Sequence, residues 1–132
     1  MSKLVLLLFL CVTSLVFSMS PQSDPWYKIH TLEDAITAMK IHNEKNELYD
    51  GLYVLRILVL KNKFKSLKMQ YVLATQYERI VKAYPNDKHA KTNLKHNLQA
   101  IKNALKGNKL NKSQRDFYSK FYQRLAPIYN RK

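Results

Sequence analysis

Leu48 to Leu60 reads LYDGLYVLRILVL and is the most apolar stretch of the chain beyond its first twenty residues. Leu48, Leu52, Leu55 and Val59 recur at steps of four, three and four, which is the period of an α-helix. Apolar side chains also occupy the remaining faces of such a helix. A helix that is apolar on every side is expected to be buried. The stretch therefore predicts a central helix around which the other elements pack.

A β-strand is the competing interpretation, because Val, Ile and Tyr favour sheets. The run is long for a strand, and no turn signal brackets a partner strand, so the helix is favoured. Gly51 weakens this helix by roughly 1 kcal/mol relative to alanine. We expect Gly51 to mark either the close approach of another backbone or the point where the helix begins.

The segment before this helix carries a capping signal, TLED at residues 31–34. In a capping box Thr31 would cap the helix while Asp34 reaches back to the cap. This first helix is expected to end within residues 42–46, and Trp26 and Ile29 are expected to fold back over the core.

Two more helices follow the central one. Ser66 is the predicted cap of a helix that Pro85 ends, because the residue before a proline avoids the helical conformation. Asn86 or Asp87 then caps a fourth helix, which Gly107 ends. Its core-facing positions are expected to be Ala90, Leu94, Leu98, Ile101 and Leu105.

A last helix is predicted to begin near Asn111 or Ser113 and to end before Ala126-Pro127. Phe117, Phe121 and Leu125 have helical spacing and are expected in the core. The fold class is therefore all-α, a small bundle or short α-solenoid of about five antiparallel helices. The helix, Tyr-Pro-Asn-Asp turn and helix at residues 71–105 are similar to the hairpin of helical-repeat proteins, a resemblance that covers one hairpin.

Residues 1–18 have the three parts of a secretory signal peptide: Lys3, an apolar run from Leu4 to Phe17, and a small residue, Ser18, before the expected cleavage. Cleavage after Ser20 is the second choice. An uncleaved membrane anchor is disfavoured because the apolar run is shorter than the roughly 20 residues that span a bilayer. The single cysteine, Cys11, lies in this leader, so residues 19–132 are predicted to form one secreted, basic helical domain without disulfides.

The formal charge of +14 is unevenly distributed. Residues 19–55 hold three lysines and six acidic residues, whereas residues 56–132 hold nineteen Lys or Arg and three acidic residues. Such polarity suits association with polyanions or anionic membranes. The alternative is the Lys-, Asn- and Tyr-rich composition that an AT-rich genome encodes.

Two groups of lysines are the candidate binding residues for a polyanion, and the charge interaction should be sensitive to salt. The lysines of the fourth helix recur at helical spacing and share one face, whereas the others follow the central helix. The first group is Lys88, Lys91, Lys95, Lys102 and Lys106, and the second is Lys61, Lys63, Lys65 and Lys68.

Other chemistry has little support in the sequence. There is no GxSxG, glycine-rich phosphate loop, HExxH or cysteine-based metal pattern, and the Glu33-Asp34 pair suits helix capping, so no enzyme activity, cofactor or metal is expected. The four histidines, His30, His42, His89 and His96, are expected on the surface. The aromatic tail suggests base stacking, but core packing is the stronger interpretation. Asn111-Lys112-Ser113 is a possible N-glycosylation site.

These observations favour a secreted, non-enzymatic binding or effector protein whose partner is an extracellular polyanion, such as a sulfated glycan, or an acidic protein. Two alternatives stay open. In one, the bundle carries a small apolar ligand among Met39, Met69, Tyr71, Tyr77 and Tyr84. In the other, the basic fourth helix acts on anionic membranes. The sequence makes no prediction of the oligomeric state.

Overall fold

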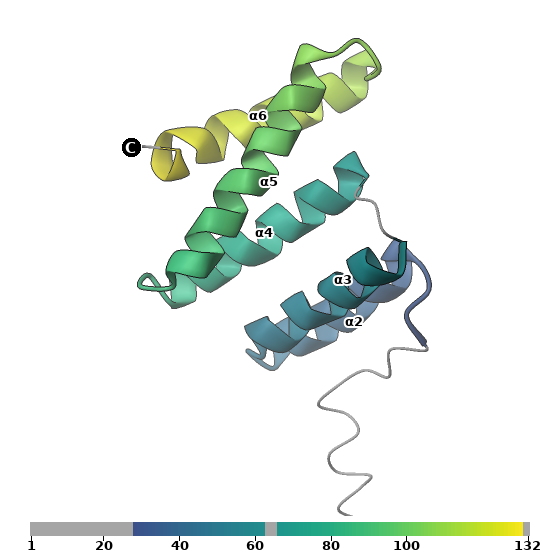
Figure 1. Cartoon of the computed structure of the whole chain (residues 1–132), viewed down its shortest axis with the longest axis vertical. Coiled ribbons are helices and arrows are strands. Elements are labelled where there is room, and N and C mark those ends of the chain that lie inside the picture. Colours follow the sequence, from purple (N-terminus) through teal and green to yellow (C-terminus); the bar gives the residue numbers. More distant parts are fainter. Residues whose placement is uncertain (1–27, 63–65, 131–132) are drawn as a thin grey trace, which may run out of the picture.

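A computed structural model describes residues 28–62 and 66–130 of the chain. Within them it has five helices and no strand, which confirms the all-α prediction (Figure 1). The predicted signal peptide lies outside the described residues. The helices are α2 (Leu32–Glu44), α3 (Leu48–Asn62), α4 (Leu67–Ala83), α5 (Lys88–Lys106) and α6 (Lys112–Tyr129).

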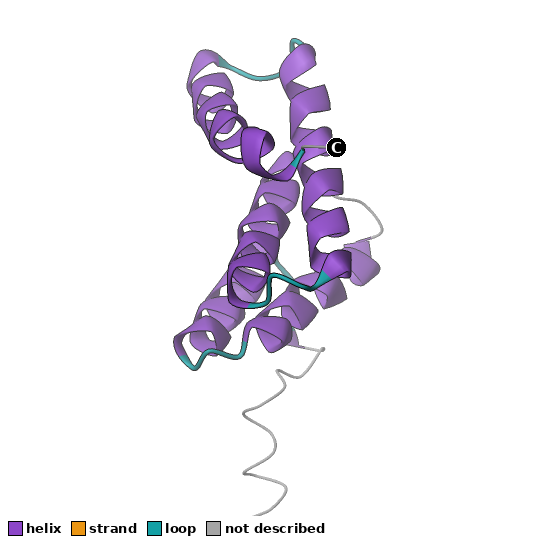
Figure 2. Cartoon of the chain, turned by 90° about the vertical axis from the view of Figure 1, so that its left-hand side faces the viewer, coloured by secondary structure: helices purple, strands orange, loops and turns teal. Residues whose placement is uncertain are grey.

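The helices form a small bundle in which α2 and α3 lie side by side at one end and α6 lies at the other (Figures 1 and 2). The middle is filled by α4 and α5, which pack closely on one another. One cluster of buried side chains extends through the bundle from Ile29 to Leu125. None of the described helices combines the length and the apolar character that crossing a membrane requires.

The central helix is α4, and the prediction that α3 would be buried on every side is wrong. Leu60 of α3 is 77% exposed, and Tyr49, Tyr53 and Arg56 also face solvent. The inner face of α3 is buried as expected, with Leu55 fully enclosed. The outer face stays open because the main packing partners of α3, α2 and α4, both lie on its inner side. The apolar side chains of α3 point in all directions, but neighbouring helices cover only its inner face.

The contacts of α4 explain its central place, because it reaches every other described helix. It packs on α3 and α5, Gln76 bonds to Asn43 of α2, and Tyr71 and Glu78 contact α6. The sequence gives α4 a wide apolar face, and Ile80 and Ala74 are fully buried on it. Tyr84, the residue that follows α4, is exposed because the helix has already ended at Ala83.

The predicted helix starts are confirmed by side-chain hydrogen bonds. Thr31 and Asp34 form the capping box of α2. The Ser66 hydroxyl accepts a hydrogen bond from Met69 N at 3.2 Å at the start of α4. Asp87, rather than Asn86, caps α5 by accepting from Ala90 N at 3.0 Å. Each cap satisfies a backbone donor that the first turn of a helix leaves open.

The end of α2 lies within the predicted range and has a recognisable geometry. Asn46 adopts a left-handed conformation with φ of 60°. The amide of Glu47 donates to the His42 carbonyl, and the amide of Asn46 donates to the Asn43 carbonyl. This is the Schellman pattern of helix termination, in which asparagine can take the place of glycine.

The prediction that Ala126-Pro127 ends the last helix is wrong, since α6 continues to Tyr129 with Pro127 inside it. Proline lacks an amide donor and normally disrupts a helix interior. Here it stands in the final turn, and the next amides resume the ladder, with Asn130 N donating to the Ala126 carbonyl at 2.9 Å. Leu125 and Tyr129 on either side pack on the core, which holds this turn in place.

The aromatic positions of α6 also differ from the prediction. Phe121 and Leu125 are buried as expected, but Phe117 is 50% exposed and Tyr118 is buried in its place. Both rings contact Tyr71 of α4 edge-on, with centroids 5.0 and 5.9 Å from it. The cluster gives Phe117 an outer position because Tyr71, Tyr118 and Phe121 already fill the space between α4 and α6.

One expectation for Gly51 was that another backbone approaches the helix closely there, and other elements do come close to α3 at this residue. A β-carbon at Gly51 would lie 3.0 Å from Gln76 Nε2 and 3.1 Å from Asn43 Oδ1. These two atoms belong to a pair of amide side chains that bond to one another across the surface of α3. The approaching groups are therefore side chains rather than the backbone that the sequence suggested.

Candidate functional site: a lysine stripe on α5

The five lysines predicted on the fourth helix form one stripe along α5, and we call this set the lysine stripe. At 100° per residue they fall within an arc of about 60°, and they extend over about 27 Å of the helix axis. Four of them are exposed and Lys102 is half-buried. The members of the stripe are Lys88, Lys91, Lys95, Lys102 and Lys106.

The face of α5 next to the stripe anchors the helix in the core. Ala90, Leu94, Leu98 and Ile101 are buried, as predicted, and Leu105 is half-buried. Gly107 ends the helix with an ordinary φ of −81°, so the stop uses no left-handed residue. The stripe is therefore presented by a straight element that is held along its length and capped by Asp87.

Acidic groups do not neutralise the stripe. In residues 28–62 and 66–130, none of its five lysines lies within ion-pair distance of a carboxylate. Glu78, the acidic residue of α4, is held by Arg124 of α6 through two hydrogen bonds of 3.0 and 3.3 Å. Its carboxylate also lies 3.7 Å from the Lys82 ammonium. The carboxylate of Glu78 thus pairs with Arg124 and Lys82 rather than with the lysine stripe.

Asp87 has two internal partners. Its carboxylate caps α5 and accepts a hydrogen bond of 2.5 Å from the Tyr49 hydroxyl. The Tyr49 bond and then the Ala90 amide lower the pKa of Asp87, while the Asp87 bond raises the pKa of Tyr49 to about 12. This acidic residue therefore has a structural role at the start of the lysine stripe.

An open groove of about 390 Å³ borders the stripe between the ends of α4, α5 and α6. Ile128 in this groove is exposed, and burial raises the pKa of Tyr129. The groove joins two cations of the stripe to a small apolar surface. Its lining residues are Val81, Pro85, Lys91, Lys95, Ile128 and Tyr129.

The second predicted lysine group is engaged differently. Lys61 Nζ donates to the Ile29 carbonyl at 2.7 Å, and the Lys68 ammonium lies 3.7 Å from the Glu33 carboxylate. Lys63 and Lys65 lie outside the described residues. Lys61 and Lys68 thus attach α3 and α4 to the segment around α2. Their partners are more than thirty residues away in sequence, so local charge density did not reveal these contacts.

The structure also brings together three potential metal ligands that the sequence analysis did not group. His42, Glu47 and Asp50 each offer one ligand atom, and these atoms all lie within 4.8 Å of one another. Imidazole and carboxylates suit ions such as Zn²⁺. The same contacts also serve the loop directly, because His42 Nδ1 faces the Glu47 carboxylate at 3.7 Å.

The expectation that all four histidines lie on the surface is wrong for His42, which is 1% exposed. His30, His89 and His96 are exposed as predicted. His42 is buried because it is in the last turn of α2, where the chain reverses and α3 folds back over it. Its spacing of three from the buried Met39 was the available signal.

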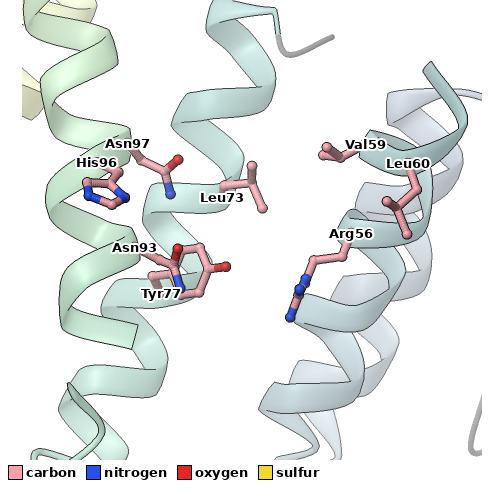
Figure 3. Close-up of a pocket in the computed structure, with 8 residues that line it drawn as sticks. All are labelled: Arg56, Val59, Leu60, Leu73, Tyr77, Asn93, His96 and Asn97. Carbon is pink, nitrogen blue, oxygen red and sulfur yellow. The ribbon is translucent and has the colours of Figure 1, made fainter. Parts of the chain in front are cut away.

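The residues considered for an internal ligand do not surround one cavity. Met39 and Met69 are packed in the core, and Tyr71 belongs to the aromatic cluster with α6. Tyr84 stacks on Tyr49 at the surface, with ring centroids 5.3 Å apart. Tyr77 lines a separate pocket between α3, α4 and α5, which the sequence did not predict (Figure 3).

Asn111 is exposed and caps α6. Its side-chain oxygen accepts a hydrogen bond from Gln114 N at 2.8 Å, while Gln114 Oε1 accepts from Asn111 N. A glycan would attach to the side-chain nitrogen, which this capping box does not use. Capping and glycosylation of Asn111 are thus geometrically compatible.

Comparison of the chain with protein-family models, curated proteins and solved structures finds no match.

Proposed function

We propose that the chain is a secreted, non-enzymatic binding protein whose lysine stripe engages an extracellular polyanion, with a sulfated glycan as the favoured class. The observation that carries this proposal is the row of five lysines on one helical face with no carboxylate partner in the described part of the chain. The predicted signal peptide supports an extracellular partner.

The shape of the stripe favours a linear polyanion over a compact one. A straight row of about 27 Å can follow several successive anionic groups of an extended chain. Binding would release counterions from the polyanion, so affinity should fall steeply with salt. Helical neighbours of like charge repel one another by roughly 0.2–0.5 kcal/mol per pair. An anionic partner relieves that repulsion, which adds a reason for it to bind here.

Action of α5 on a membrane is less well supported. The apolar face that would enter a bilayer contains Leu94, Leu98 and Ile101, each fully buried in the bundle. Insertion would have to remove α5 from α4 and α6. The lysine stripe, by contrast, is accessible with the fold intact, and binding of an acidic protein or an anionic surface would use the same lysines.

The test asks whether binding depends on where the lysines lie or only on the net charge of the protein. Lys91, Lys95 and Lys102 are replaced by glutamate in one variant, and Lys40, Lys109 and Lys120 in a matched control. Both variants change the net charge equally, and the control lysines are exposed and make no ion pair in the described residues. The measurement is the salt needed to elute each protein from heparin and from a sulfonate exchanger.

We expect the unmodified protein to need clearly more salt on heparin than on the exchanger. The stripe variant should lose this excess, whereas the control should keep most of it. Equal losses in the two variants, with circular dichroism showing both folded, would refute the assignment to the stripe. Equal elution of the unmodified protein from both columns would refute arranged polyanion binding altogether.

A further inference from the structure

The pocket between α3, α4 and α5 has the chemistry of a ligand site that is separate from the lysine stripe. It has a volume of about 250 Å³, and Figure 3 shows α3 on one side and α4 with α5 on the other. The residues lining it combine polar groups with aliphatic ones. They are Arg56, Val59, Leu60, Leu73, Tyr77, Asn93, His96 and Asn97.

Arg56 gives the pocket a permanent positive charge, since a guanidinium stays protonated. Its side chain extends from α3 into the space opposite Tyr77 (Figure 3). Within the described residues Arg56 makes no ion pair or hydrogen bond, and no acidic side chain lines the pocket. Arg56 also counteracts part of the increase that burial causes in the pKa of Tyr77. The pocket therefore favours an anion.

Asn97 supplies a donor that lacks an acceptor. The residue is 4% exposed, and its side-chain nitrogen has no hydrogen-bond partner in the described structure. Figure 3 shows Asn97 extending from α5 toward Leu73 and Tyr77. A buried donor without a partner is destabilising, and an oxygen of a bound ligand would satisfy it.

Beside the polar side chains of Asn93 and His96, the pocket also has an aliphatic wall, which sets the second requirement of the ligand. Val59, Leu60 and Leu73 line the pocket, and Leu60 is the most exposed large apolar side chain in the described residues. A cavity of about 150 Å³ accommodates benzene, so this pocket suits a somewhat larger group. The geometry calls for one anionic end and a short apolar body.

We propose that this pocket binds a small organic anion, a carboxylate joined to a short aliphatic chain. Arg56 pairs with the carboxylate, the Asn97 amide donates to a ligand oxygen, and the chain covers Leu60 and Leu73. On α5 the residues of this pocket are about 80° or more around the helix from the nearest lysine of the stripe. Binding here is thus independent of polyanion binding there.

The test is a titration of the ¹⁵N-labelled protein with acetate, butanoate, hexanoate and octanoate, and with octan-1-ol as an uncharged probe. We expect shifts in the backbone amides around Arg56, Leu73 and Asn97. Each added CH₂ that reaches the apolar wall should tighten binding roughly fourfold. Arg56→Gln should weaken octanoate binding at least tenfold and change the affinity for octan-1-ol less than twofold.

Arg79→Gln is the matched control, because Arg79 is an exposed arginine of α4 outside the pocket. Asn97→Asp should also weaken octanoate binding, since it places a like charge beside the ligand. If no carboxylate of the series shifts the pocket amides at millimolar concentration, the proposal is wrong. Equal weakening by Arg56→Gln and Arg79→Gln, both folded, overturns it too. Heparin elution of Arg56→Gln measures the stripe separately.

Discussion

At the scale of single residues, the amide pair of Asn43 and Gln76 is the contact that best defines how the helices meet. Gln76 is fully buried, and its side-chain nitrogen donates to Asn43 Oδ1 and to the Leu48 carbonyl, both at 2.8 Å. Asn43 returns a bond of 2.9 Å to Gln76 Oε1. The Gln76 side chain of α4 thus bonds to both α2 and the first turn of α3. It fits there because Gly51 has no side chain.

This pair predicts a strong coupling between two substitutions. Removing either amide breaks the bonds that join the two side chains, and a buried polar group that loses a partner costs about 1–3 kcal/mol. The double variant Asn43→Ala/Gln76→Ala should therefore lose less stability than the two single variants together, by about 0.5–3 kcal/mol. Urea denaturation of the four proteins measures this difference. Strictly additive losses would show that the two amides do not act as a pair.

At the scale of elements, most helix ends follow local rules, and α6 shows one end that does and one that does not. Its start is set by the Asn111 capping box. Arg115 donates to the carbonyls of Leu105 and Gly107, which connects α6 to the end of α5. Its far end overrides a local rule, because the packing of Leu125 and Tyr129 keeps Pro127 within the helix.

The cap of α6 gives a prediction that separates folding from glycosylation. Asn111→Ala should lower the free energy of unfolding by about 1 kcal/mol, whereas Asn111→Ser should keep most of it because serine also caps. Both changes destroy the sequon. Ser113→Ala destroys the sequon and leaves the Asn111 cap intact. Denaturation of unglycosylated protein checks the cap, and the mass of protein secreted by eukaryotic cells checks the glycan.

That pattern would be contradicted if Asn111→Ser were as unstable as Asn111→Ala. If the unmodified chain and Ser113→Ala, both secreted by eukaryotic cells, differ in mass only by the substituted side chain, the sequon is not used.

At the scale of the whole molecule, the hydrogen bond from Tyr49 to Asp87 joins two halves of the bundle, the pair of α2 and α3 and the group of α4, α5 and α6. It connects the first turn of α3 to the cap of α5, and Tyr49 also stacks on Tyr84 beside it. The bond raises the pKa of Tyr49 to about 12 and lowers the pKa of Asp87. It therefore makes the junction of the two halves sensitive to both extremes of pH.

The raised pKa of Tyr49 predicts a loss of stability at alkaline pH. Because the pKa is higher in the folded protein than in the unfolded chain, where it is near 10, the contribution is fully present below pH 10. It is lost as the pH rises toward 12. Tyr49→Phe should be less stable than the unmodified protein at pH 9, and the gap should narrow by pH 12.

Urea midpoints at several pH values measure this gap. Tyr53→Phe is the control, since Tyr53 is an exposed tyrosine of the same helix without a hydrogen bond in the described region. A gap that stays constant from pH 9 to 12 would contradict the role of this bond. On the acid side the lowered pKa of Asp87 acts in the opposite sense, so its contribution is lost as the pH falls through that lowered value.

Much of the fold was predictable because the signals are local. The cap residues Thr31, Ser66 and Asp87 form hydrogen bonds within the first turns of their own helices. The apolar period of α5 marks its buried face, so both features can be predicted from residues that are close in sequence. The lysine stripe was predictable for the same reason. Which of Phe117 and Tyr118 is buried was not predictable, because either ring fits the helical pattern of α6. The choice depends on contacts with Tyr71 of another helix.

Five helices, most of their ends and the face of α5 that carries its lysines follow from the amino-acid sequence, because each depends on contacts within a few residues. Packing between the helices makes α4 rather than α3 central, buries His42, and gives Lys61 and Lys68 their partners within the protein. It also creates the pocket of Arg56 and Asn97. These features join residues from different helices, and such pairings depend on how the elements pack rather than on any one stretch of sequence.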